Sequence, residues 1–131
     1  MKTRTLYLFS GLFGSIEAAG AYCERDWGEA PSDDASPQQW EAWENEFPKW
    51  KFREELDVYL DEDFMEFHFG SERVEALEEL LALDLERQNV ESLIENDDTL
   101  IVLDDNALGD FPAELKSTYA LRFLGAYVGR A

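Results

Sequence analysis

The segment "DTLIVLDD", residues 98–105, constrains the fold of this chain more than any other stretch. A strand with one face in water alternates polar and apolar side chains, whereas here the apolar residues follow one another without interruption. Carboxylates bound the run at both ends. The pattern therefore predicts a short strand that is buried on both faces and has a central place in a sheet.

Three further regions have strand character. Residues 4–11, "RTLYLFSG", are rich in aliphatic and aromatic side chains and end at a glycine, and residues 117–129, "STYALRFLGAYVG", alternate. Residues 56–60 and 63–69 also alternate. This third region predicts either two strands around a turn or one long bent strand.

Helices are predicted between these strands. Ser15 can cap a helix whose apolar face runs from Ile16 to Trp27. The signature "SPQQ" at residues 36–39 combines a capping serine, a proline at the first helical position and a capping-box glutamine. It predicts a second helix that ends before the next proline.

Residues 71–96 carry apolar side chains at helical spacing, and Asp84 or Asn89 can divide them into two helices by offering a new cap. The 131 residues can bury one sizeable core but are too few for two domains. We therefore expect a single domain over residues 1–131 with an α+β (α/β layer) fold. In it, helices pack on a single mixed β-sheet of about four to five strands, whose order the sequence leaves open.

Net charge determines which partners this chain can bind. Thirty acidic and 11 basic side chains give a formal net charge of -19. Such a field repels phosphate backbones and anionic membrane surfaces, so we expect binding to neither nucleic acid nor membrane. The complementary partner is a basic protein.

The single cysteine and the N-terminal segment bear on the compartment. Cys23 is the only cysteine, so an internal disulfide cannot form, which fits a reducing compartment. Lys2 and Arg4 precede an apolar run that resembles a secretory signal, but glycines interrupt the run and Glu17 lies just before the apparent cleavage site. No segment approaches the roughly 20 apolar residues of a membrane-spanning helix. We expect a cytoplasmic protein.

Patterns for catalysis and metal binding are incomplete. The acidic segments "DEDFME" and "DDNALGD" both lack the ligand spacing of a calcium loop. His68 is the only histidine, and no serine lies in a nucleophile-elbow sequence. The glycines of "SGLFGS" come without the lysine of a phosphate-binding loop. We therefore expect no catalytic residues, no metal site and no cofactor.

Residues 56–70, "LDVYLDEDFMEFHFG", interleave carboxylates with apolar and aromatic side chains. Alternation in strands would turn the rings inward and present the carboxylates outward. Four tryptophans also lie close together; most can close the core beneath the long loop, while one or two stay partly exposed and anchor a partner. The predicted partner-binding residues are Asp57, Asp61, Glu62, Asp63, Glu66, Trp40, Trp43 and Trp50.

Several of these motifs resemble those of one bacterial family. "FSGLFGS", residues 9–15, is similar to the opening of the immunity protein 22 family, and Tyr22 falls where its first helix carries a tyrosine. "YLDEDFMEFHF", residues 59–69, looks like its second motif, and "TLIVLDD" and "LRFLGAY" match its two closing strands. Residues 27–50 are longer and more aromatic than the family pattern.

The resemblance implies a bacterial immunity protein that neutralises a cognate toxin delivered between competing cells, without supplying contact residues. We expect an acidic immunity protein that binds a basic toxin, for example a nuclease, by direct contact. The alternative is an acidic interaction module or nucleic-acid mimic that binds a basic host protein. A third function, an enzyme acting on carbohydrate or phosphate esters, requires a pocket lined by two carboxylates. The toxin's activity, the mode of inhibition and the oligomeric state stay open.

Overall fold

The computed structural model of the chain describes residues 3–109 and 114–131 and has the expected α+β fold. Its strands are β1 (Thr3–Gly11), β2 (Met65–Phe69), β3 (Thr99–Asp104) and β4 (Arg122–Arg130). Its α-helices are α1 (Ile16–Cys23), α2 (Pro37–Glu46), α3 (Lys51–Leu56), α4 (Glu72–Leu80) and α5 (Asp84–Leu93), with short 3-10 helices η1 (Glu62–Phe64) and η2 (Asp105–Leu108). No helix in the described ranges is long and apolar enough to cross a membrane.

One four-stranded sheet has the order β2-β3-β1-β4. The predicted central place of β3 is confirmed, and each of its residues is buried. The strand pairs are all antiparallel, so the expected mixed pairing is wrong. Helices α4 and α5 form a two-helix connection that returns the chain to the end of the sheet it left, and Phe69 pairs with Thr99 across that connection. A strand that starts where its neighbour ended must run in the opposite direction.

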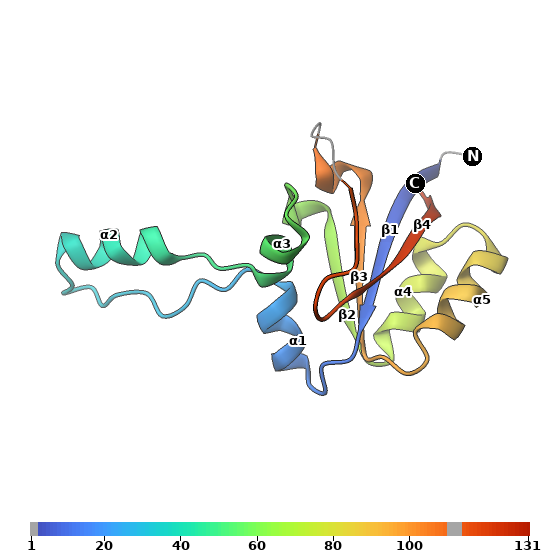
Figure 1. The fold of residues 1–131 in the computed structure, drawn as a ribbon, viewed down its shortest axis with the longest axis horizontal. Helices are drawn as coiled ribbons and strands as arrows, with labels where there is room; N and C mark the ends of the chain where they lie inside the picture. The colour runs from blue at the N-terminus through green and yellow to red at the C-terminus, as the bar shows by residue number, and fades with distance from the viewer. Residues whose placement is uncertain (1–2, 110–113) are drawn as a thin grey trace.

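Two hydrophobic clusters cover the two faces of the sheet, with α1 and α3 on one side and α4 and α5 on the other (Figure 1). Ile101 and Leu103 belong to the first cluster, while Leu100 and Val102 belong to the second. Successive side chains of a strand point to opposite faces. The apolar run of β3 is therefore uninterrupted because both faces are covered.

The predicted strand at residues 56–60 is wrong. Phe52 and Leu56, four positions apart, are both buried on one side of α3. The helix ends at Asp57, which has a left-handed backbone (φ 57°), and Leu60 reaches the same core from the irregular segment that follows. Spacing of four residues suits both a helix and an alternating strand, so periodicity over so short a stretch did not separate them.

Other boundaries follow the sequence more closely. The predicted capping box is confirmed, because the Ser36 hydroxyl accepts from the N–H of Gln39 and the Gln39 side chain accepts from the N–H of Ser36. The helical region after residue 71 divides before Asp84, close to one of the two predicted breaks. Asp84 is the first residue of α5 rather than its cap, because the N-cap is Leu83 and no side chain caps the helix. Helix α1 ends at Cys23, so Trp27 does not belong to it.

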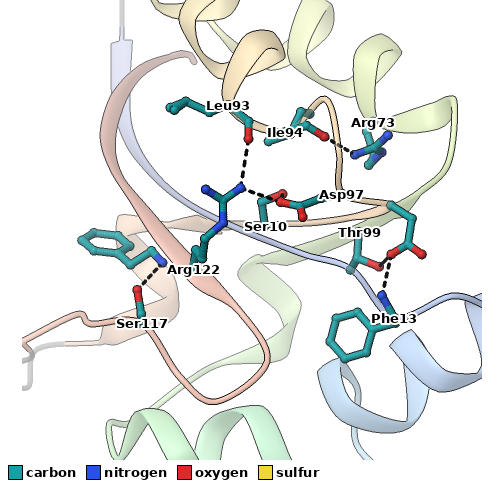
Figure 2. Close-up of polar contacts among 11 residues, drawn as sticks. Ser10, Phe13, Arg73, Leu93, Ile94, Asp97, Thr99, Ser117 and Arg122 are labelled. Atoms are coloured by element: carbon teal, nitrogen blue, oxygen red, sulfur yellow. Dashed lines mark hydrogen bonds and ion pairs between the residues drawn. The ribbon is translucent and has the colours of Figure 1, made fainter.

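A polar network fixes the turn between β1 and α1 to the start of β3 (Figure 2). The Asp98 carboxylate accepts hydrogen bonds from the N–H groups of Phe13 (2.9 Å) and Gly14 (2.7 Å) and from the Thr99 hydroxyl (2.9 Å). Burial raises the pKa of Asp98, but these bonds oppose that effect. Together with the positive charge of Arg73, they leave the pKa below its ordinary value.

Asp98 is expected to contribute stability that disappears in acid. Its folded pKa lies below that of an unfolded aspartate, about 3.9. The contribution is therefore complete above that pH and is lost as the pH falls through the folded pKa. Asp98→Asn should lower the free energy of unfolding by about 1–2 kcal/mol at about pH 7, and by less at about pH 3. Urea denaturation of both proteins at the two pH values measures this, and a pH-independent difference would contradict it.

Candidate functional site

Residues 26–49, here called the arm, leave the domain and return to it (Figure 1). At its base Asp26 and Lys49 exchange two backbone hydrogen bonds, with N···O distances of 2.6 and 2.8 Å. The outgoing limb is irregular and the returning limb is α2. A helix packed on the sheet would bury one of its sides, but no residue of α2 is buried. The arm therefore stands apart from both faces of the sheet.

Aromatic side chains hold the two limbs of the arm together. The indole N–H of Trp43 donates to the carbonyl of Trp27 across the limbs at 3.0 Å. Trp27, Trp40 and Phe47 all surround Trp43, with ring centroids 5.8–6.4 Å from it. Phe47 packs directly on the backbone at Gly28, where a Cβ would lie 2.5 Å from the ring and where φ is +62°. This cluster is separate from both cores of the domain.

These aromatic side chains are only partly covered by the arm itself. Trp27 is 50% exposed, and Trp40, Trp43 and Phe47 are half-buried. The expectation that most tryptophans close the core is therefore wrong, because three of the four lie on the arm. Aromatic area held outside a core on a projecting segment is typical of a surface that binds another macromolecule.

The arm is also strongly acidic. Lys49 is its one basic residue, and it lies 3.1 Å from the carboxylate of Glu46. Its acidic residues are Asp26, Glu29, Asp33, Asp34, Glu41, Glu44 and Glu46, all exposed. The aromatic cluster is thus surrounded by excess negative charge.

The predicted carboxylates gather at η1 and β2. Asp61, Glu62, Asp63 and Glu66, here called the acidic ridge, lie on η1, its N-cap and β2, which forms one edge of the sheet. Asp61 is half-buried and its carboxylate accepts from the N–H of Asp63, while the other three are exposed. Asp57 is exposed too, but it ends α3 and is separated from the ridge by the buried Leu60.

Ridge carboxylates have few partners of opposite charge. Glu62 pairs with Arg25 at 3.4 Å, and Glu66 lies 3.1 Å from the His68 ring. Asp63 and Glu66 line a small cavity of about 100 Å³ next to Arg4. Exposed pairs of this kind contribute little stability. The ridge is therefore available to cations of another molecule.

Trp50 does not belong to the predicted surface. It is 5% exposed, and its indole N–H donates to the carbonyl of Cys23 at 2.7 Å inside the first hydrophobic cluster. The reason is its position: it directly follows the base of the arm, where the chain re-enters the domain and begins α3. Trp40 and Trp43, by contrast, lie on the arm.

Arg25 joins the arm to the acidic ridge. Its guanidinium lies 5.4 Å from the centre of the Trp50 ring and also pairs with Glu62. A shallow pocket of about 280 Å³ beside it is lined by Trp27 from the arm and by Met65 and Phe67 from β2. The base of the arm therefore adjoins the ridge at Glu62, while Asp63 and Glu66 line the separate cavity beside Arg4.

Part of this surface was not among the predicted binding residues. Phe47, Glu29 and Glu46 were not singled out as binding residues. The available signal was the combination of Trp40, Trp43 and Phe47 on one side of a helix whose other residues are polar. A helix whose other residues are polar does not pack into a core, so three large aromatic side chains on one of its sides indicate contact with another surface.

The chemistry of nucleophilic catalysis is not set up at Cys23 or Tyr22. Burial, with a contribution from the charge of Glu24, raises the pKa of Cys23 to about 12, so the thiol is protonated at neutral pH. Burial likewise raises the pKa of Tyr22 to about 12; hydrogen bonding to Glu55 adds to this effect and bonding to Thr118 opposes it. Within residues 3–109 and 114–131, no group of three His, Cys, Asp or Glu side chains could hold a metal ion.

No protein-family model, curated protein or solved structure matches this chain. The resemblance to the immunity protein 22 family therefore rests on the quoted sequence motifs. The fold defines the class: a small α+β protein with a projecting arm that is acidic and partly exposes aromatic side chains.

Proposed function

We propose that this chain is an immunity protein of bacterial competition, which binds a cognate basic toxin and neutralises it by direct contact. The single observation that carries the proposal is the projecting acidic arm with its partly exposed aromatic cluster, whose base adjoins the acidic ridge at Glu62. Aromatic side chains supply binding energy when a partner excludes water from them, and surrounding charge steers the encounter. The motifs shared with the immunity protein 22 family supply the link to toxins.

A basic toxin would also relieve a cost of the free protein. Carboxylates close together on the ridge repel one another, and a net charge of -19 extends that repulsion to the whole domain. Cationic side chains from a partner replace repulsion by attraction. A nuclease is a suitable partner because its own cleft must attract phosphate. Such a complex would form in the cytoplasm of the cell that makes both proteins.

Co-expression with the product of the neighbouring gene, which the proposal expects to be a toxin, tests the proposal. We expect the two proteins to co-purify, and we expect the dissociation constant to rise with salt between about 50 and about 300 mM NaCl, since screening weakens charge attraction. The toxin's activity should fall in proportion to complex formation. Absence of binding, together with salt-dependent binding to a basic host protein, would favour the acidic interaction module or nucleic-acid mimic instead.

Neutralising the acidic ridge should weaken this complex. The variant Asp61→Asn, Glu62→Gln, Asp63→Asn, Glu66→Gln removes four negative charges while keeping side-chain size. Each exposed charge contributes about 0.5 kcal/mol, so we expect affinity to fall roughly 10–30-fold and its salt dependence to decrease. Isothermal titration calorimetry with the co-expressed toxin measures both quantities.

A matched control removes four charges that lie outside the ridge. Glu75, Glu78, Glu79 and Glu95 are all exposed, on α4 or just after α5. Changing them to glutamine lowers net charge equally but leaves the ridge intact. If the control weakens binding as much as the ridge variant does, net charge rather than the ridge determines affinity.

A further inference from the structure

A groove runs between the two limbs of the arm. Its volume is about 400 Å³, and it is open to solvent. Aromatic rings from the returning limb and carboxylates from both limbs line it: Glu29, Pro31, Gln39, Trp43, Glu46 and Phe47. The volume accommodates a long side chain, and the lining combines flat apolar area with negative charge.

Two cations of the chain itself already bind to this kind of lining, one beside the groove and one outside it, next to the base of the arm. Lys49 Nζ lies 5.1 Å from the centre of the Phe47 ring and 3.1 Å from the carboxylate of Glu46. Arg25 lies over the Trp50 ring and pairs with Glu62 in the same way. An aromatic face combined with a carboxylate therefore recurs as a cation site on this surface.

We propose that the groove binds an arginine side chain of the basic partner. A planar guanidinium can stack on an aromatic ring while its N–H groups reach carboxylates at the edge. Trp43 provides the aromatic face, and Glu29 and Glu46 provide negative charge from opposite limbs. Lysine fits less well because its ammonium is compact and more strongly hydrated. The identity of the partner rests on the proposed function, but the chemistry of the groove can be tested without a toxin.

A second copy of this chain is a poorer occupant. The arm carries seven carboxylates against one lysine, and the whole chain has a net charge of -19. Two such molecules would bring like charges together at the interface, which costs free energy. Charge complementarity therefore selects a basic protein as the occupant.

Lys49 acts as an internal competitor in this arrangement. It occupies the Glu46 carboxylate and one approach to the Phe47 ring. An incoming guanidinium must share that carboxylate or displace the ammonium. Removing the charge with Lys49→Gln leaves the backbone hydrogen bonds to Asp26 in place and should therefore strengthen arginine binding. If binding were nonspecific and depended only on net charge, loss of the single Lys49 charge would change the affinity for arginine only slightly.

The test follows the backbone amide and indole N–H signals of the ¹⁵N-labelled full chain by NMR. The probe is the peptide acetyl-Gly-Arg-Gly-Arg-Gly-amide at constant ionic strength, and the lysine version serves as a comparison. We expect the Trp43 signal to shift with the arginine peptide and the buried Trp50 signal to stay in place. Glu29→Gln, Glu46→Gln should weaken binding about fivefold, and Lys49→Gln should strengthen it about threefold.

A matched control separates the groove from the general charge of the arm. Glu41 and Glu44 lie on the same helix but do not line the groove, so Glu41→Gln, Glu44→Gln makes the same change in net charge. Equal weakening by the two double variants would overturn the proposal. So would shifts confined to β2, equal binding of the lysine peptide, or a dimer in sedimentation that Trp43→Ala dissociates.

Failure of the groove and failure of the proposed function give different results. If the toxin binds but the arginine peptide leaves Trp43 unshifted, the immunity function stands and the groove proposal falls. If the peptide binds as expected while the neighbouring toxin does not, the groove proposal stands and the immunity function falls.

Discussion

Replacing residues 27–48 with the dipeptide Asn-Gly is expected to give a folded domain that has lost its binding affinity. Asp26 and Lys49 exchange both backbone hydrogen bonds, which is the geometry that a two-residue hairpin turn closes. No residue of the arm belongs to either hydrophobic cluster. The free energy of unfolding should therefore change by no more than about 1 kcal/mol.

The same variant should bind the co-expressed toxin at least about 100-fold more weakly. The arm carries the aromatic cluster, and loss of central aromatic contacts costs about 2 kcal/mol or more for each of the residues that dominate an interface. Titration calorimetry measures the affinity, and urea denaturation shows that the domain is intact. Trp43→Ala in the full arm should reproduce a substantial part of the loss.

Two results would contradict this prediction. An unfolded variant would show that the arm supports the core, which its burial pattern does not indicate. A folded variant with unchanged affinity would place the binding surface on the domain alone and would remove the arm from the proposed function.

Trp50→Ala is expected to destabilise the domain by about 3–5 kcal/mol, as truncation of a large buried aromatic side chain does. The ring is 5% exposed within the first hydrophobic cluster, and its N–H bonds the Cys23 carbonyl. Truncation leaves a cavity and an unsatisfied carbonyl. Trp40→Ala is the matched control: the same residue type on the arm should cost less than about 1 kcal/mol. Urea denaturation followed by circular dichroism measures both changes.

Equal losses for the two variants would mean that the arm and the domain unfold as one unit with shared packing. A loss for Trp50→Ala below that of Trp40→Ala would contradict the assignment of Trp50 to the core. Either result would also weaken the expectation that the arm can be removed without unfolding the domain.

Much of the fold was predictable from local sequence. The uninterrupted apolar run at residues 100–103 indicated a central strand, and the capping box at Ser36 located the start of α2, because both signals depend on neighbouring residues. Helix α3 was missed because Phe52, Leu56 and Leu60 have a spacing that also fits alternation. The antiparallel pairing depended on where α4 and α5 return the chain, which no local pattern encodes.

The candidate site was predictable in kind but not in arrangement. The sequence identified the carboxylates at residues 61–66 and the tryptophan-rich segment as the two unusual features. Their contact depends on Arg25, which pairs with Glu62 and lies over the Trp50 ring. That arrangement requires the base of the arm to lie beside β2, and only the packing of α1 and α3 on the sheet places it there.

Composition and order of residues by themselves determined the net charge and most of the helices and strands, since these follow from side-chain chemistry and short-range periodicity. Only the tertiary structure decided which tryptophans became core and which stayed outside. Trp50 lies where the returning chain meets α1 and is buried there. Trp40 and Trp43 lie on α2, in the arm, whose two limbs contact each other instead of the sheet. Burial depends on the path of the backbone, which is a property of the whole chain.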